Sequence, residues 1–370
     1  MKILFISHTF PPVFGGVERQ NYYLSEELKK IAQVKVIANG KGKKWLFVFL
    51  PAAFIRAMFL MPRYDACLLG NGVLAPIGAV LKFFHPKKKF FCVVHGLDIT
   101  FAYKKGFLPA VYKNINVPSL KKLDKLIMVG NHTIDEAVKI GIDRNHCRFI
   151  PNGINFDDLS ASSSRNGMEK ILGANLEGKK VILRIGRFVP HKGVDWFLKN
   201  VMPNLPENYF FVAVGGIVSS KAGDESNFSK CEKAIKEFNL ENRTRLIGNI
   251  DENDKLMLLN SVDLYISPNV RISGSMEGFG ITAIEGGACG RVVLASDLEG
   301  LKDAIKDGRN GFLVEPGNAA AWISKIRELL EDDGFRKDFG EKAKKFVADN
   351  YSWKNIAKKY LEEINSAANV

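Results

Sequence analysis

Residues 180–202 read KVILRIGRFVPHKGVDWFLKNVM, and they contain the pattern from which the fold can be predicted. Its first six residues form a short apolar run that predicts a buried strand. A loop bounded by Gly186 and Gly193 follows, and residues 195–202 have the composition of a helix. This order predicts one half of a parallel β-α-β unit, because a parallel neighbour is reached only by a long crossover connection.

The same alternation continues outward in both directions. We expect strands at residues 2–7, 33–38, 66–70, 90–95, 125–130, 148–150, 180–185, 209–214, 243–247, 264–267, 292–295 and 311–314. We expect helices at residues 16–30, 46–61, 75–84, 119–123, 132–140, 195–202, 227–238, 251–261, 281–288, 298–306 and 319–331, and a helical end at 335–368 with a break near Tyr351. This order predicts an α/β fold with two open parallel sheets in tandem.

A chain of 370 residues is long enough for two domains, because a single core stops growing at roughly 250–300 residues. Residues 157–168 are rich in serine and almost free of apolar residues, which is typical of a linker. We therefore predict a first domain at residues 1–168 and a second at 169–351. A final helix at about 352–370 is expected to cross back to the first domain.

Composition argues against several classes of protein. The five cysteines are widely spaced, with no C-x-x-C pair and no histidine at zinc spacing, so we expect no disulfide framework, no structural metal and a reducing compartment. The first apolar run is too short for a signal-peptide core, and the best candidate for a membrane span is interrupted by Pro51 and Arg56. These features predict a cytoplasmic protein.

The net charge of +13 is concentrated in one half of the chain. Residues 1–170 contain 25 Lys and Arg against 12 Asp and Glu, whereas the charges of the remaining residues balance. Between Leu28 and Leu97 the single acidic residue is Asp65. We therefore expect an anionic partner to face the first domain.

Ligands of open parallel sheets bind beyond the carboxyl ends of the strands, so the loops after strands are the candidate sites. In the first half, Gly15 and Gly16 open a helix, where accessible backbone N–H groups suit a phosphate or an acceptor; a simple turn is the alternative. His95 follows the fourth strand, where its imidazole can hydrogen-bond to a sugar hydroxyl. A structural histidine is the alternative.

In the second half, Arg187 and Lys192 lie in the loop after the strand at 180–185. Two cations that bracket a loop can hold a diphosphate, the guanidinium through a directed fork and the ammonium as a point charge. Solvated surface charge is the alternative. No serine or threonine follows Lys192, so the loop is not a Walker motif.

The most specific stretch is Glu277-Gly278-Phe279-Gly280-Ile281-Thr282-Ala283-Ile284-Glu285. Gly278 and Gly280 leave the backbone accessible, and a helix that begins near Ile281 directs free N–H groups toward an anion. Carboxylates repel a diphosphate, so Glu277 is expected to accept sugar hydroxyls and Glu285 the hydroxyls of a ribose. Acids that only support the helix dipole are the alternative.

The pattern Gly-Arg-x-x-x-x-Lys-Gly at residues 186–193, followed by Glu277-Gly278-Phe279-Gly280 and a second glutamate eight residues after the first, resembles the retaining GT-B glycosyltransferases of family 4. Gly15-Gly16, His95-Gly96 and Ile150-Pro151-Asn152-Gly153 extend the resemblance over nearly the whole chain. It implies two Rossmann-like domains that face each other across a cleft. The second would hold the nucleotide-sugar donor, and the first the acceptor.

Carried onto this chain, the resemblance implies that Arg187 and Lys192 hold the diphosphate, Glu277 the transferred hexose and Glu285 the ribose. The backbone from Gly278 through Phe279 and Gly280 to Ile281 would also meet the donor. His95 would face the reacting sugar, and Gly16 the phosphate or the acceptor. Two departures from the family pattern, Gly215-Gly216 and the longer loop at 273–276, leave the sugar open, and the choice between GDP and UDP is open as well.

The resemblance also implies transfer with retention of the anomeric configuration, in which the leaving phosphate acts as the base. The sequence contains no Asp-x-Asp triplet, so we expect no metal ion and no other cofactor. Arg187, Lys192 and the helix that begins near Ile281 would instead balance the charge that grows on the departing diphosphate.

Lys41, Lys43 and Lys44 precede the apolar run at 45–61, a composition suited to a helix that lies in an anionic headgroup layer. We expect a peripheral enzyme on the inner face of the cytoplasmic membrane, with a membrane-lipid or cell-envelope glycan as acceptor. A helix that only packs on the sheet is the alternative.

Two other classes of protein fit part of the sequence. A basic nucleic-acid-binding protein fits the charge, but the chain lacks a recognisable RNA-binding module and such a function leaves Glu277 and Glu285 unexplained. A Rossmann-type oxidoreductase fits the alternation, but the glycine fingerprint is missing. We therefore expect no nucleic-acid partner.

Overall fold

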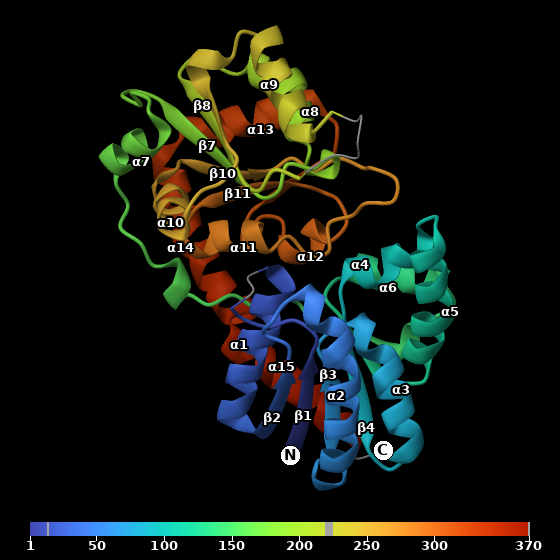
Figure 1. Cartoon of the computed structure of the whole chain (residues 1–370). Helices are drawn as coiled ribbons and strands as arrows, with labels where there is room; N and C mark the ends of the chain where they lie inside the picture. Colours follow the sequence, from blue (N-terminus) through green and yellow to red (C-terminus); the bar gives the residue numbers. More distant parts are fainter. Residues whose placement is uncertain (13–14, 219–224, 369–370) are drawn as a thin grey trace. The chain divides into compact units, whose positions relative to one another are not determined.

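The computed structural model describes residues 1–12, 15–218 and 225–368; Val13 and Phe14, in the loop before Gly15, lie outside the described residues. The chain divides into two compact units (Figure 1). The first unit comprises Met1–Gly153 and Tyr351–Val370, and the second comprises Ile154–Asn350. The last stretch of the chain therefore belongs to the same unit as the first.

The first unit is built on a six-stranded parallel sheet in the order β2-β1-β3-β4-β5-β6. Its strands are β1 (Lys2–Ser7), β2 (Gln33–Ala38), β3 (Ala66–Leu69), β4 (Lys89–Val94), β5 (Lys125–Met128) and β6 (Cys147–Phe149). Its α-helices are α1 (Gly16–Ile31), α2 (Leu46–Leu60), α3 (Ala75–Phe84), α4 (Gly96–Thr100), α5 (Phe107–Lys121), α6 (Asn131–Lys139) and α15 (Trp353–Ala368). The central strands are apolar throughout because helices cover both faces of the sheet.

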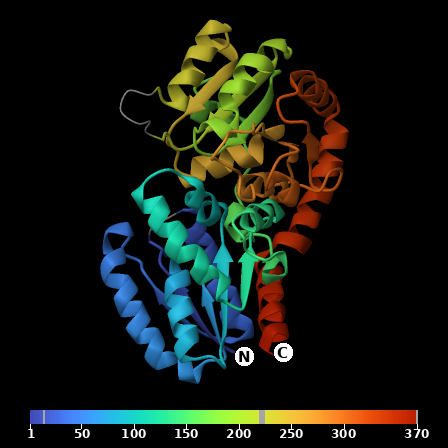
Figure 2. The ribbon, with the colours of Figure 1, turned by 90° about the vertical axis from the view of Figure 1, so that its right-hand side faces the viewer.

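Two helical layers cover the opposite faces of this sheet. On one face, Ala53 of α2 packs in a common core with Leu81 of α3 and Leu120 of α5. On the other face, Leu28 of α1 shares a core with Tyr360 of α15. Figure 2 shows the strands between the blue helices α2 and α3 on one side and the red helix α15 on the other.

The second unit contains a six-stranded parallel sheet in the order β12-β11-β10-β7-β8-β9. Its strands are β7 (Lys180–Ile185), β8 (Tyr209–Val214), β9 (Thr244–Ile247), β10 (Leu264–Ser267), β11 (Val292–Ser296) and β12 (Phe312–Val314). Its α-helices are α7 (Arg165–Leu172), α8 (Val194–Asn200), α9 (Asn227–Glu237), α10 (Glu252–Ser261), α11 (Ile281–Ala288), α12 (Leu301–Ala304), α13 (Ala319–Glu331) and α14 (Asp333–Tyr351), which leads back to the first unit. The predicted α/β architecture with two parallel sheets is confirmed.

The predicted strands agree with the structure to within two residues, but the helices were predicted less well. Helices α4 and α7 were not expected, and the bounds of α5 were predicted wrongly. The sequence suggested a short helix at 119–123, whereas α5 covers Phe107–Lys121. Two prolines concealed it. Pro109 lies in the first turn, where its missing N–H is not needed, and the helix continues through Pro118.

The boundary between the units also differs from the expected position. The serine-rich stretch at 157–168 was expected to end the first domain, but it belongs to the second unit. The Asn260 side chain donates a hydrogen bond to the carbonyl of Leu159 (3.1 Å), and the Ser164 N–H donates to the Ser261 hydroxyl (3.0 Å). These bonds attach the stretch to α10, an attachment that composition alone cannot reveal.

Candidate active site

Three loops of the second unit come together at one edge of its sheet. Strands β7, β10 and β11 are neighbours, and the loops after them carry Lys192, Glu277 and Glu299 respectively. After β7 the chain adds β8 and β9 on one side and then returns to place β10 on the other. The strand order therefore reverses between β7 and β10, the position at which open α/β sheets bind ligands.

Lys192 and Glu277 form an ion pair across this position. The ammonium of Lys192 donates to Glu277 Oε2, and the side chains of both residues are largely buried. The amide of Asn269 donates to the same oxygen at 3.2 Å. Because an ammonium carries three N–H donors, Lys192 can keep Glu277 and still donate to an anion.

Burial and charge shift the pKa values of this pair. Burial by itself raises the pKa of Glu277, but the positive charge and hydrogen bond of Lys192, with smaller contributions from His191 and Asn269, lower it overall. The pKa of Lys192 is lowered, first by burial and then by the nearby charges of Arg184 and Arg187, against the attraction of Glu277. The carboxylate is thus held ionised in a region of positive potential.

Two arginines contribute to this potential in different ways. Arg187 is exposed on the loop after β7. Arg184, the second-last residue of β7, is fully buried. Its guanidinium donates to the carbonyl of Gly186 and, at 3.3 Å, to that of Arg187. Arg184 therefore supports from below the loop that presents Arg187.

The loop itself is fixed by close backbone contacts. At Gly193 φ is +69°, and a Cβ atom there would come within 1.9 Å of the Pro268 carbonyl oxygen, so only glycine fits. The imidazole Nδ1 of His191 contacts the Ser275 hydroxyl at 2.7 Å. Burial, followed by the charge of Lys192, lowers the pKa of His191 to about 4, so this imidazole is neutral at pH 7.

Helix α11 begins at Ile281 after Gly280, whose φ of +82° is left-handed. A Cβ at Gly300 would come within 2.3 Å of the Gly278 carbonyl oxygen, so the turn after Glu277 lies directly on the loop after β11. Phe279 is buried beneath it, and Glu285 lies one turn into the helix. The first N–H groups of α11, which have no partner within the helix, thus follow Glu277 by about one turn of chain.

The backbone of Glu277 is held by a second glutamate. Its N–H donates to Glu299 Oε2 at 2.6 Å. Glu299 adopts φ +49°, a left-handed conformation that is costly for a residue with a Cβ atom. The fold tolerates this backbone strain because the Glu299 side chain holds the turn before α11 in place.

In the first unit, His95 lies between β4 and α4. Its backbone N–H donates to Asp98 Oδ2 at 2.9 Å, and its ring bonds to the carbonyl of Gly70. The ring atom Nε2 is buried and has no hydrogen-bond partner among the described residues. Burial lowers the pKa of His95, so a neutral ring that donates to Gly70 leaves Nε2 as an acceptor for a hydroxyl.

Gly16 is the first residue of α1, and it is exposed. A Cβ atom added there would meet no described atom within 4 Å. Packing within the unit therefore does not explain the absence of a side chain at this position.

The structure brings some of the predicted residues together and separates others by unit. Lys192 and Glu277 are in contact, and Arg187, Gly278–Ile281 and Glu285 belong to the same edge of the second unit. His95 and Gly16 lie in the first unit.

Sequence reasoning missed Arg184, Asn269 and Glu299 and assigned no role to His191. Arg184 could have been noticed, since it is a charged residue among the apolar side chains of β7. Asn269 and Glu299 follow strand ends, but only strand order shows that they reach Glu277.

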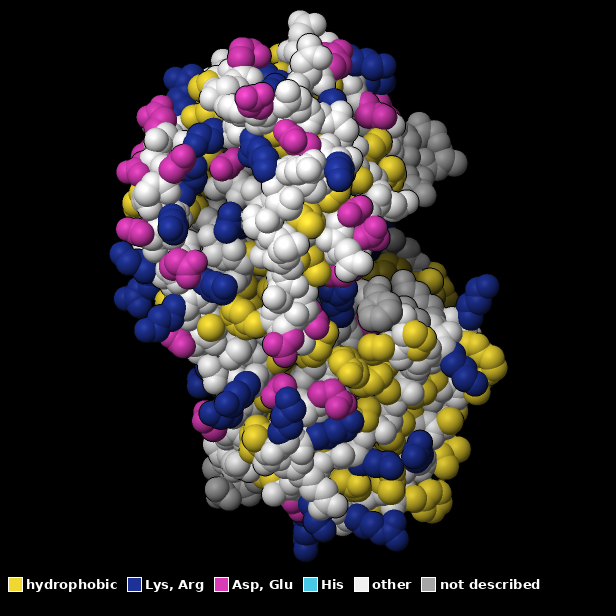
Figure 3. All heavy atoms as spheres, turned by 90° about the vertical axis from the view of Figure 1, so that its left-hand side faces the viewer, with side chains coloured by type: hydrophobic (Ala, Val, Ile, Leu, Met, Phe, Trp, Pro, Cys, Tyr) yellow, Lys and Arg dark blue, Asp and Glu magenta, His cyan; other side chains and the backbone are white. Residues whose placement is uncertain are grey.

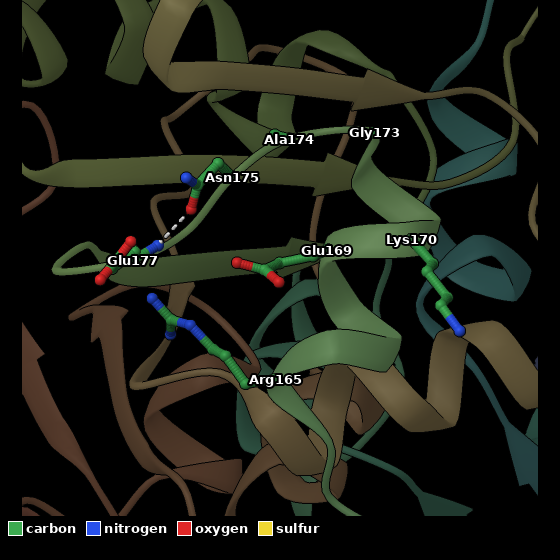
Figure 4. Close-up of a pocket in the computed structure, with 7 residues that line it drawn as sticks. All are labelled: Arg165, Glu169, Lys170, Gly173, Ala174, Asn175 and Glu177. Atoms are coloured by element: carbon green, nitrogen blue, oxygen red, sulfur yellow. Dashed lines mark hydrogen bonds between the residues drawn. The ribbon is translucent and has the colours of Figure 1, made fainter.

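A surface pocket of about 720 Å³ lies elsewhere in the second unit (Figure 4). In it Arg165 donates to the carbonyls of Leu176 and Lys179, and Glu169 accepts from the Leu176 N–H at 2.8 Å. Its lining consists of Arg165, Glu169, Lys170, Gly173, Ala174, Asn175 and Glu177. None of the predicted donor residues lines it, and its hydrogen bonds attach α7 to the loop before β7, so its role is structural.

Comparisons with known proteins agree with this geometry. Residues 169–346 match the family described as "Glycosyl transferases group 1", and residues 14–158 match "Glycosyltransferase Family 4". The two matches together span most of the chain. They divide it close to the boundary between the two units.

Individual relatives and solved structures point the same way. The chain is 27% identical over 220 residues to a phosphatidyl-myo-inositol mannosyltransferase of Mycobacterium leprae. The aligned region covers 59% of this chain and 53% of that protein. It is 27% identical over 278 residues to an N,N'-diacetylbacillosaminyl-diphospho-undecaprenol alpha-1,3-N-acetylgalactosaminyltransferase of Campylobacter jejuni, covering 74% of this chain and 69% of that protein. The fold matches Anabaena HepE in complex with UDP and glucose, with a TM-score of 0.75 and 18% identity over 99% of this chain and 100% of that chain. The chain therefore belongs to the group 1 glycosyltransferases of family 4 and has the GT-B architecture.

Proposed function

We propose that this enzyme transfers a hexose from a nucleoside-diphosphate sugar, UDP- or GDP-linked, to a hydroxyl of a lipid-linked or cell-envelope glycan. Transfer retains the anomeric configuration and needs no metal ion. The reaction takes place on the cytoplasmic side of the membrane. The first unit binds the acceptor and the second unit binds the donor.

The observation that carries this proposal is the Lys192–Glu277 pair at the reversal of the strand order. Lys192, Arg187 and the N-terminus of α11 supply positive potential and N–H donors for a diphosphate. Glu277, held ionised by Lys192, offers a carboxylate acceptor for sugar hydroxyls. A diphosphate joined to a sugar is a ligand that needs both the positive groups and the carboxylate acceptor.

The same groups support the chemical step. Negative charge grows on the departing diphosphate, and the fixed cations balance it; the loss of one such group typically costs about 10²–10³ in rate. The acceptor hydroxyl attacks the face that the diphosphate leaves and passes its proton to the leaving phosphate. In the first unit, His95 Nε2 is available to accept a hydrogen bond from a sugar hydroxyl, because it has no partner among the described residues.

Metal independence is supported by the site's own charges and by the sequence, which has no Asp-x-Asp triplet. The described residues also contain no group of three or more His, Cys, Asp or Glu suited to a metal ion. We expect full activity in EDTA. Activity that EDTA abolishes and magnesium restores would contradict this part of the proposal.

The relatives support the choice of donor and acceptor class. Anabaena HepE was solved with UDP and glucose, and the Campylobacter relative is named for a diphospho-undecaprenol acceptor. The first supports a nucleoside-diphosphate donor, and the second supports a lipid-linked acceptor. A panel of UDP- and GDP-sugars in saturation-transfer NMR identifies the donor, and the anomeric proton coupling of the product distinguishes retention from inversion.

The central test is nucleotide binding by titration calorimetry with the variant Lys192→Ala. Lys199→Ala is the matched control, because it removes the same charge from the exposed side of α8. We expect Lys192→Ala to weaken UDP or GDP binding at least tenfold and the control to leave it unchanged. Equal binding by both variants, or preferential binding of NAD or an oligonucleotide by the wild type, would refute the proposal.

A further inference from the structure

The first unit exposes large apolar side chains on one helical layer. They include Phe47 and Phe59 on α2, Phe83 and Phe84 on α3, and Phe107 and Leu108 on α5. Phe47 is 87% exposed and Phe107 is 81% exposed. We call these six side chains, with the faces of α2, α3 and α5 that carry them, the apolar face.

The three helices of this apolar face lie side by side. Helices α2, α3 and α5 cover the same side of the sheet, and α3 contacts both of its neighbours. Figure 3 shows, on the side of this unit that faces left in Figure 1, hydrophobic side chains gathered with Lys and Arg. Large apolar side chains that are exposed together on neighbouring helices are typical of a binding site rather than of ordinary protein surface.

The charge of the apolar face is of one sign. None of the helices α2, α3 and α5 contains an Asp or Glu. Arg56 is exposed on α2, and Lys104 and Lys105 directly precede α5. At the start of α2 the ammonium of Lys41 lies 4.6 Å from the ring centre of Trp45, which is half exposed. Aromatic and basic side chains in this mixture suit the headgroup layer of an anionic membrane.

The packing of α2 decides how it meets a membrane. The segment Leu46–Arg63 is long and apolar enough to span a bilayer by length and composition. However, Ala53 and Ala57 are fully buried against the sheet, so one side of α2 belongs to the core of the unit. A helix held in this way offers its other side to a membrane surface.

We propose that the apolar face docks the enzyme on an anionic lipid bilayer, with the Phe side chains of α2, α3 and α5 inserted among the lipids and the basic side chains at the headgroups. Charge complementarity favours this occupant over an apolar peptide or a second copy of the chain. The inference deepens the proposed function, because α5 and His95 lie on the same β4–β5 connection. A membrane held at the apolar face therefore supplies a lipid-linked acceptor to the unit that carries His95.

Vesicle flotation tests the proposal. The wild type should float with phosphatidylcholine–phosphatidylglycerol vesicles at low salt and much less with pure phosphatidylcholine vesicles. The double variant Phe47→Ser/Phe59→Ser should reduce binding at least tenfold, since it removes two inserted rings. Arg56→Ala should reduce binding about fivefold. The control Ile31→Ser/Val138→Ser removes exposed apolar side chains from α1 and α6 and should bind like the wild type.

A second readout uses the fluorescence of Trp45. Among the four tryptophans it is the exposed one, so anionic vesicles should shift the emission to the blue in the wild type but not in Trp45→Phe. Nucleotide binding without vesicles should be equal in all these variants, which confirms that they fold and separates the two proposals. Failure of the wild type to float while it binds nucleotide would overturn only the docking proposal. A dimer that Phe47→Ser/Phe59→Ser converts to a monomer would overturn it in favour of self-association.

Discussion

At the scale of single residues, burial decides which charged groups face one another. Lys192 and Glu277 lie 85 positions apart, yet they share a largely buried ion pair. Removal of the cation would leave a buried carboxylate without charge compensation, which costs free energy of folding. The pair therefore differs from an ordinary surface salt bridge and is a good candidate for ligand recognition.

Gly16 offers a test of whether a ligand approaches the start of α1. Since a Cβ there meets no described atom, Gly16→Ala should fold normally and gain up to about 1 kcal/mol from the removal of glycine from a helix. If substrate approaches this backbone, the same variant should lose at least tenfold in transfer rate. Thermal unfolding and a transfer assay measure both. Unchanged activity would assign Gly16 to a turn.

His191 predicts a pH dependence of stability. Its pKa falls from 6.5 to about 4 on folding because of burial and then the charge of Lys192, with Arg184 and Arg187 acting in the same direction and Glu277 opposing. The unfolded chain therefore binds the extra proton between these pH values. Stability should be complete above pH 6.5 and fall as the pH drops toward 4, by up to about 3 kcal/mol.

Chemical denaturation at a series of pH values measures this effect. His191→Gln should flatten the curve between pH 6.5 and pH 4, because the group that titrates is gone. Glu277, whose pKa is lowered, contributes a further loss only at more acidic pH. A slope that is the same in wild type and variant would contradict the role given to His191.

At the scale of elements, the turn before α11 is held by a strained residue. Glu299 keeps φ +49° and accepts the N–H of Glu277. Glu299→Gly should relieve the backbone strain and leave stability equal or slightly higher, while donor binding weakens about tenfold because the Glu277 backbone loses its partner. Glu299→Gln keeps an acceptor oxygen and should retain most of the binding. Calorimetry with nucleotide compares the three proteins.

Two glycines at this edge of the sheet allow close contacts between loops that precede helices. Gly193 fits against the Pro268 carbonyl, and Gly300 fits against that of Gly278. Both contacts join loops from neighbouring strands. Helices α8 and α11 are placed by backbone packing as much as by their own sequences.

At the scale of the whole molecule, the chain returns to its first unit. Ile356, Tyr360 and Ile364 of α15 are fully buried in a core shared with α1 and β1. Ile356→Ala should therefore destabilise the first unit by about 2–5 kcal/mol. Hydrogen exchange should rise in β1 and α1 and stay unchanged in the sheet of the second unit. Lys358→Ala, exposed on the same helix, is the control. Equal effects in both units would contradict the division.

Features that depend on neighbours along the chain could be predicted from the sequence alone. Short apolar runs between amphipathic segments specify parallel strands and crossover helices, so the two sheets and the loops carrying Arg187, Lys192 and Glu277 could be predicted. The long helix α5 could not, since its prolines suggested a break. The position of β7 beside β10 became known only from the folded structure, because strand order depends on how helices pack on the sheet. The order β11-β10-β7 joins Lys192 to Glu277 and brings Glu299 to the backbone of Glu277. In the first unit, separately, the packing of helices on the sheet buries Ala53 and leaves Phe47 and Phe107 exposed.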